Sequence, residues 1–250
     1  MQPLQTDNIR LAATVMLVQD GTAGPEVYMV KRPGHGDFPD LHVFPGGKVD
    51  AGDWLPNSCP ELTDERASGL LNVTGGGLRY WVAVARECFE ECGVLLANNR
   101  GQWIDLSLPD NRAEWAASRA RLLAGEQSWE SLLNNAKLTI ATDHLLYFSH
   151  WITPPSVPRR FDTRFFVAAM PHGQVALADT DETQGGTWVA PSQALALHRA
   201  GEWQMIDPTL LSLQALARFD CVNELLVGIR EGAHAITWTE SLGRQGMQQD

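Results

Sequence analysis

The sequence predicts a protein of the α/β class, in which strands and helices are interspersed along one chain. Short runs rich in β-branched and aromatic residues, typical of strands, occur in both halves of the chain. Between them, apolar residues recur at spacings of three and four over residues 78–92, which is the period of a helix. Hydrophobic residues make up 44% of the chain and charged residues 20%, as in ordinary globular proteins.

The chain is expected to begin with strands. Residues 9–19 and 26–31 are β-rich and are separated by a turn that contains glycine and proline. After a loop over residues 32–41, a short strand at 42–44 ends at a Pro-Gly-Gly sequence. Residues 54–77 are polar and end in a glycine triplet, so we interpret them as a partly irregular insertion with a flexible joint at residues 75–77.

The segment 78–92 predicts a helix that ends at Gly93, a residue favoured directly after helices. Its expected core stripe is Val82, Ala85, Phe89 and Cys92. The rest of the chain predicts helices at 112–123, 129–135 (capped by Ser128), 191–200 and 208–219, strands at 145–152, 163–170 and 187–189, and a weakly patterned tail from 231.

Three acids on the 78–92 helix break a local rule. Glu87, Glu90 and Glu91 share one face near the helix C-terminus, which already carries roughly half a negative charge. Repulsion between such neighbours costs about 1–4 kcal/mol per close pair at effective dielectrics of 80 to 20. A residue pattern that opposes the fold in this way often serves a site, and a divalent cation would resolve the conflict.

Composition limits the partners. The formal net charge of −11 argues against a nucleic-acid polyanion. Four cysteines do not form a disulfide framework in 250 residues. Cys88 and Cys92 are better interpreted as small buried hydrophobes than as soft-metal ligands. The first apolar run, 11–18, is too short to span a membrane and lacks a preceding basic segment, so we expect no membrane partner and a cytoplasmic location.

The acids belong to a longer pattern. Gly47, Asp53 and the run Arg86-Glu87-x-x-Glu90-Glu91-x-Gly93-Val94 resemble the signature of the Nudix hydrolases. The pattern departs from the family in having Asp53 where a Glu is usual and a much longer spacer, residues 54–85. The segments 42–47 and 158–166 also resemble the subgroup with an interrupted signature, which includes coenzyme A diphosphatases. Glu182 followed by 188–191 resembles an acidic loop, a strand and a helix start that occur widely in the family.

The resemblance implies an α/β/α sandwich around a mixed sheet, in a single domain over residues 1–250. The insertion 54–77 would lie beside the site, and its deletion would leave the fold intact while changing substrate preference. A helical insertion would occupy 99–143, and a helical extension with a tail would occupy 201–250. Homodimerisation is plausible for the family.

The implied activity is hydrolysis of the diphosphate linkage of a nucleoside diphosphate joined to another group, using Mg²⁺ or Mn²⁺. Coenzyme A or acyl-CoA is the leading substrate, with ADP-ribose, NADH and sugar nucleotides as alternatives. A non-catalytic nucleotide-sensing module is the rival reading. Hard oxygen ligands suit these cations, and diphosphate cleavage needs charge neutralised around phosphorus and an aligned water.

The resemblance also implies roles for particular residues. The metal ligands would be Glu87, Glu90, Glu91 and the carbonyl of Gly46. The general base is open between Glu90, Glu91 and Glu182. Arg86 would orient the carboxylates through charge-assisted hydrogen bonds, and Asp53 would brace the loop. The candidates for substrate phosphates are Arg32, Arg159, Arg160 and Arg164.

Overall fold

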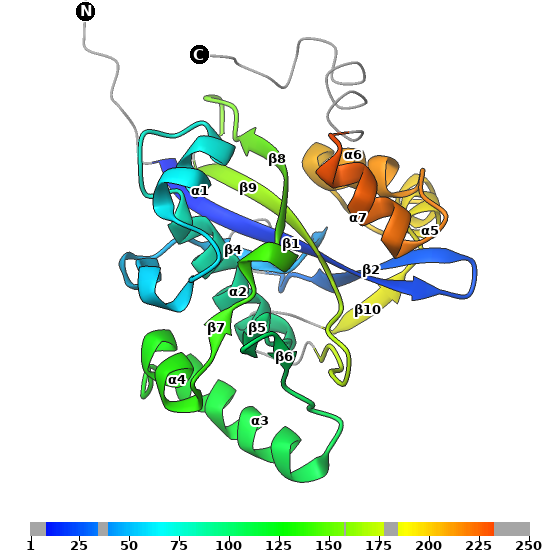
Figure 1. The fold of residues 1–250 in the computed structure, drawn as a ribbon. Helices are drawn as coiled ribbons and strands as arrows, with labels where there is room; N and C mark the ends of the chain where they lie inside the picture. The colour runs from blue at the N-terminus through cyan, green and yellow to red at the C-terminus, as the bar shows by residue number, and fades with distance from the viewer. Residues whose placement is uncertain (1–8, 35–39, 158, 178–184, 233–250) are drawn as a thin grey trace, which may run out of the picture.

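The computed structural model describes residues 9–34, 40–157, 159–177 and 185–232. A mixed sheet runs through its centre (Figure 1). The strands of this sheet are β1 (Ile9–Gly21), β2 (Gly24–Lys31), β3 (His42–Val43), β4 (Gly46–Lys48), β8 (Leu146–Ile152), β9 (Arg160–Ala169) and β10 (Gly186–Val189). Their order is β10-β2-β1-β9-β8, with β3 paired to β2 and β4 to β1. The β1–β9 pairing is parallel and the others are antiparallel, so the expected mixed sheet is confirmed.

Helices cover both faces of this sheet (Figure 1). The helices are α1 (Asp64–Leu71), α2 (Leu78–Cys92), α3 (Pro109–Leu123), α4 (Trp129–Ala136), α5 (Pro191–Arg199), α6 (Asp207–Leu216) and α7 (Val222–Arg230). Side chains alternate along β1: Val15 and Leu17 join the core under α2, whereas Met16 and Val18 join the core under α6 and α7. The sheet therefore lies between two layers of helices, with one hydrophobic core on each face, as in an α/β/α sandwich.

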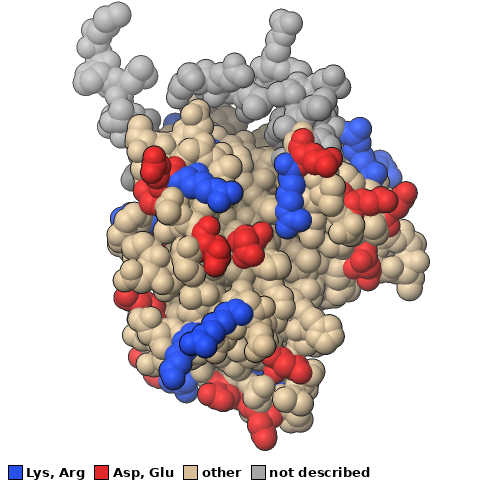
Figure 2. All heavy atoms as spheres, in the orientation of Figure 1, with Lys and Arg blue, Asp and Glu red and all other residues tan. Residues whose placement is uncertain are grey.

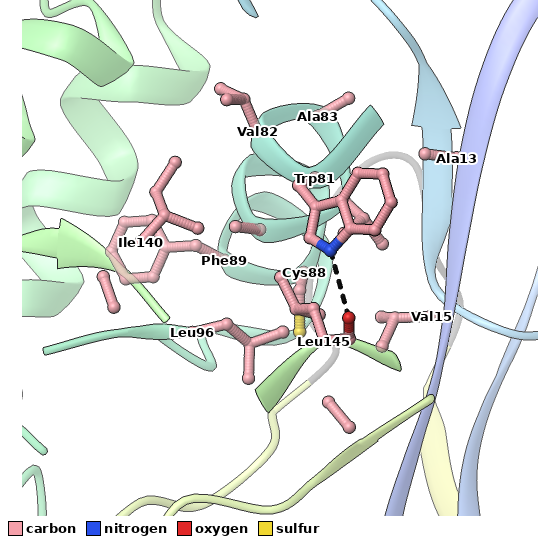
Figure 3. Close-up of a cluster of buried hydrophobic side chains, with 14 of the residues drawn as sticks. Ala13, Val15, Trp81, Val82, Ala83, Cys88, Phe89, Leu96, Ile140 and Leu145 are labelled. Carbon is pink, nitrogen blue, oxygen red and sulfur yellow. Dashed lines mark hydrogen bonds between the residues drawn. The ribbon is translucent and has the colours of Figure 1, made fainter. Parts of the chain in front are cut away.

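Helix α2 is buried almost all round. Trp81 anchors its inner face, because the indole N–H donates to Leu145 O over 3.0 Å (Figure 3). The Trp81 ring also meets Phe166 edge-on, with ring centroids 4.8 Å apart. The predicted bounds of this helix agree with the structure, and its stripe residues are buried as expected. The acids do not lie in solvent beside that stripe, because Glu87 and Glu91 are only 8% and 2% exposed.

The segment 99–143 packs against α2 from outside the sheet. It contains α3, α4 and most of a small second sheet of β5 (Ala97–Asn99), β6 (Gln102–Trp103) and β7 (Thr139–Ile140). Trp115 of α3 meets Phe89 edge-on with ring centroids 5.9 Å apart, and Trp129 of α4 packs against the same ring at a tilt over 5.8 Å. Ser128 Oγ accepts from Ser131 N at the start of α4, which confirms the predicted cap.

The insertion 54–77 belongs to the core. It supplies buried side chains to the cluster under α2, including Leu55, Leu62 and Leu71. Its polar composition hid the helix α1, which Thr63 caps by accepting from Arg66 N. The expectation that deletion would leave the fold intact is therefore contradicted, because removing this segment would uncover a large apolar surface.

The glycine triplet is not a flexible joint. Asp64 accepts from the amides of Gly76 and Leu78, each over 3.0 Å, and Ser68 Oγ accepts from Gly77 N over 2.9 Å. These bonds satisfy backbone donors at the start of α2 that have no partner within the helix. A Cβ on Gly77 would lie 2.5 Å from Ser68 N, so the helices approach too closely for any side chain there. The insertion therefore caps the helix that carries the acids.

The described surface bears on two partner classes. On the face that Figure 2 shows, basic side chains lie in separate small groups among acidic and uncharged ones, without the broad basic area that a polyanion would need. Within the described ranges, no helix has both the length and the apolar composition required to cross a bilayer. The predicted tail after residue 231 lies mostly outside the described residues.

Replacing the cap should weaken the fold. We expect Asp64→Ala to lower the free energy of unfolding by about 1–2 kcal/mol, because two backbone amides lose their acceptor. Glu61→Ala, at an exposed position three residues earlier, should change it by less than about 0.5 kcal/mol. Urea denaturation followed by circular dichroism measures both, and equal effects would contradict the capping role.

Candidate active site

The Pro-Gly-Gly turn carries its backbone to the acidic end of α2. Gly46 has φ of +153° and lies against Thr14 of β1, where an added Cβ would collide with the strand backbone. Its amide donates to Glu91 Oε2 over 2.9 Å. Its carbonyl accepts from Arg32 Nη2 over 3.1 Å. A carbonyl oxygen has two lone pairs, so this bond leaves Gly46 O able to accept a second partner.

Arg86 organises the acids. Its guanidinium donates to both carboxylate oxygens of Asp53, from Nε over 2.9 Å and from Nη2 over 3.1 Å. The Nη1 atom donates to Glu87 Oε1 over 2.9 Å and to Glu90 Oε2 over 2.7 Å. Nη2 also donates to Lys48 O over 2.9 Å. Arg86 thus ties β4, the start of the insertion and two turns of α2 together, and the predicted orienting and bracing contacts of Arg86 and Asp53 are present.

Burial sets the protonation of this cluster. Burial, followed by repulsion from Glu91 and Glu90, raises the pKa of Glu87 to about 8, although Arg86 opposes the shift. Burial lowers the pKa of Arg86, but its hydrogen bond to Asp53 and the charges of Glu87, Asp53 and Glu90 raise it further, so it stays above its ordinary value. One cation therefore faces several carboxylates in a poorly solvated place.

The candidate oxygen donors for a divalent cation lie in two contacts, with Glu87 and Glu90 at Arg86 and Glu91 at the Gly46 turn. Glu87, Glu90, Glu91 and Gly46 O supply the hard donors that Mg²⁺ and Mn²⁺ prefer. Gly47 leaves a space that Glu87 fills, because a Cβ there would lie 2.5 Å from Glu87 Oε2. Within the described ranges, no three His, Cys, Asp or Glu side chains already surround a metal position. The donor set fits the cation by chemistry, and binding requires the glutamates to turn from Arg86 and the Gly46 amide.

The other predicted residues lie in different places. Arg160 pairs with Ile9, five residues before the Thr14 that faces Gly46, so it lies roughly 17 Å along the strands from the turn. Its Nε donates to Thr153 O over 2.9 Å, and its neighbour Arg159 is exposed. The structure thus does not bring this pair to the acids. Glu182 lies outside the described residues.

Arg164 is a buried structural cation. It is 4% exposed, its guanidinium carbon lies 5.8 Å from the ring centre of Tyr80, and its Nε lies 3.8 Å from Asp162 Oδ1. The expectation that it contacts substrate phosphates is wrong in this structure, because the side chain is enclosed under the start of α2. Cys88 and Cys92 are buried free thiols, and burial raises the pKa of Cys92 well above its usual value.

Comparison with known proteins identifies this constellation. The mixed sheet, the Pro-Gly-Gly turn and the arginine-bound acids together define the Nudix class. A family model described as the NUDT19 Nudix domain matches residues 59–216, more than half of the chain, and the chain therefore belongs to this branch of the Nudix hydrolase family.

Individual relatives agree with the family match. The putative nudix hydrolase 7 of Caenorhabditis elegans is 28% identical over 214 residues, which cover 85% of this chain and 62% of that protein. The human acyl-coenzyme A diphosphatase NUDT19 is 26% identical over 231 residues, covering 78% and 61%. The chain thus spans a little over three fifths of the length of these relatives.

A solved structure resembles the whole described fold. The crystal structure of a NUDIX hydrolase from Alicyclobacillus acidocaldarius has a TM-score of 0.73 at 25% identity, with 90% of this chain and 97% of that chain covered. The expected Nudix fold is thus confirmed.

Removing the charge of Asp53 tests the contribution of its buried ion pair with Arg86 to stability. We expect Asp53→Asn to lower the free energy of unfolding by about 3 kcal/mol, because a buried guanidinium loses its two-point partner while Glu87 and Glu90 remain. Asp50→Asn is the matched control, since Asp50 is 66% exposed and 3.7 Å from Arg86; it should cost no more than about 1 kcal/mol. Equal losses in chemical denaturation would contradict this assignment.

Proposed function

We propose that the chain is a metal-dependent hydrolase that cleaves the diphosphate linkage of coenzyme A or an acyl-CoA. The observation that carries this proposal is the set of acids on the last turns of α2, bound to Arg86 and facing the Gly46 turn. A buried, crowded group of carboxylates is costly for the fold and is suited to a divalent cation. The family match supports the same reaction class.

Each residue has a proposed task. Glu87, Glu90, Glu91 and Gly46 O would hold Mg²⁺ or Mn²⁺, which when bound neutralises charge on the diphosphate oxygens. Arg86 keeps the glutamates oriented and stays in place through Asp53. Glu90 or Glu91 would accept a proton from the attacking water, and Glu182 is the third candidate. Arg32, already at the Gly46 carbonyl, is the arginine best placed to meet a phosphate.

Coenzyme A is preferred as the substrate because several curated relatives are named acyl-coenzyme A diphosphatases. ADP-ribose, NADH and sugar nucleotides share the diphosphate and are the alternative substrates. The placement of Arg159 and Arg160 limits them to contacts with a part of the substrate distant from the acids. Homodimerisation, which the family resemblance implies, stays a prediction that sedimentation would test.

A substrate panel tests the reaction. With Mg²⁺ we expect coenzyme A and acyl-CoA to be hydrolysed faster than ADP-ribose, NADH or UDP-glucose, measured by chromatography of the nucleotide products. Glu90→Gln should lower kcat at least about 100-fold, because it removes a carboxylate charge and a candidate base. Glu114→Gln, on the exposed side of α3, should leave kcat unchanged.

The outcomes separate the alternatives. Hydrolysis of none of these compounds would overturn the enzymatic proposal in favour of a nucleotide-sensing module. Preference for ADP-ribose would overturn the substrate, and full activity of Glu90→Gln would overturn the site.

Metal binding should release a proton. In the metal-free protein the pKa of Glu87 is raised to about 8, so the group is largely protonated at lower pH, whereas a cation binds the carboxylate. Affinity for Mg²⁺ should therefore rise between about pH 6 and 8 and level off above. Calorimetry in buffers of different ionisation enthalpy measures the protons released; Glu87→Gln should release fewer, and an unchanged count would contradict the role of Glu87.

A further inference from the structure

A second arginine, from outside the Nudix signature, holds the acidic end of α2. Arg119 lies on α3, in the helical segment 99–143. Its Nε donates to Glu90 O over 2.9 Å, and its Nη1 donates to Leu177 O over 3.2 Å. The side chain is half-buried. Arg119 therefore joins α3, the last turn of α2 and the segment that follows β9.

The bond from Arg119 to Glu90 O gives a hydrogen-bond donor to a carbonyl at the end of α2. The last carbonyl oxygens of a helix accept no hydrogen bond from within the helix, because no later turn supplies backbone amides. In α2 the helix ends at Gly93, whose φ is +67°. Glu90 O then accepts from Arg119, and Cys92 O accepts from Leu177 N over 2.8 Å. Two carbonyls of the last turn, those of Glu90 and Cys92, are thus bound from outside the helix.

The guanidinium of Arg119 lies against the end of α2 at Gly93. A Cβ at Gly93 would lie 3.4 Å from Arg119 Nη1, so the guanidinium lies directly over the helix end. A cation at this place opposes the partial negative charge of the C-terminus. It also offsets the repulsion that the neighbouring glutamates add. Geometry and charge therefore agree on one role.

We infer that Arg119 is a positioning residue of the candidate site, which fixes the backbone of the Glu90–Glu91 turn so that both carboxylates are presented to the cation. This inference rests on the proposed metal-dependent function. Arg119 acts through the carbonyl of Glu90 and through Leu177, at a distance from the reacting atoms. The segment 171–177 is held to the same place, since Gln174 exchanges two hydrogen bonds with the backbone of Leu95.

The chain offers a matched control on the same helix. Arg121 lies two residues after Arg119 and bonds to Gln127 and Ser118, without reaching α2. Arg121→Met removes one positive charge from α3, as Arg119→Met does, and leaves the α2 contact in place. Arg119→Lys keeps the charge at the helix end but loses the fork that binds two carbonyls at once.

The test measures Mn²⁺ binding to the full chain by electron paramagnetic resonance, with amide hydrogen exchange of the metal-free protein. Arg119→Met should weaken Mn²⁺ binding by about 10-fold, the lower range for a group that supports metal ligands. It should also speed exchange in the last turn of α2. Arg119→Lys should recover part of the affinity, and Arg121→Met should match the wild type. At saturating metal, KM for the substrate should be unchanged in all variants.

The outcomes distinguish this inference from the proposed function. If the wild type binds Mn²⁺ and hydrolyses its substrate while Arg119→Met equals Arg121→Met, the positioning role is overturned and the function stands. A loss of unfolding free energy with unchanged Mn²⁺ affinity would also overturn it, because the role would then be only structural. A wild type that binds no Mn²⁺ would overturn both.

Discussion

The buried guanidinium of Arg86 is the contact on which the acidic site depends. Three carboxylates converge on it, and each lies on a different part of the chain or a different turn of α2. Without this cation the acids would face one another in a place where burial already raises the pKa of Glu87 to about 8. Arg86 also reaches Lys48 O, so the same side chain that separates the acids fixes the turn in front of them.

The long interruption of the Nudix signature is compatible with this geometry for a physical reason. The entropic cost of closing a loop grows only slowly with its length, so Asp53 can reach Arg86 across many intervening residues. The insertion offsets that cost by burying Leu55, Leu62 and Leu71 and by capping the start of α2 through Asp64. The helix that carries the acids is thus held at its first turn by the insertion and at its last turn by Arg119 of α3.

The sequence was sufficient where the signals were local. Helix α2 has a clear apolar period and a terminating Gly93, and its bounds were predicted correctly. Helix α1 was missed because its sequence is polar, and only Thr63 followed by acids marked its start. The second cluster of contacts could not be predicted, because Arg119 looks like any other surface arginine of α3 until the fold places it over Gly93. Arg159 and Arg160 failed in the opposite way, since closeness to a family motif along the chain did not bring them close in space.

The two-point contact of Asp53 has a consequence for how a cation can be accommodated. Glu87 and Glu90 share a single nitrogen of Arg86, whereas Asp53 binds through both its oxygens. If the glutamates turned toward a metal ion, as proposed, Arg86 would lose two partners but would keep both bonds to Asp53 and the bond to the Lys48 carbonyl. A paired and hydrogen-bonded charge can stay buried, whereas an unpaired one cannot. In the proposed site, Asp53 would therefore hold Arg86 in place if Glu87 and Glu90 turned from it to a metal ion, which gives a role to a buried aspartate, 1% exposed, that is far from the acids in sequence.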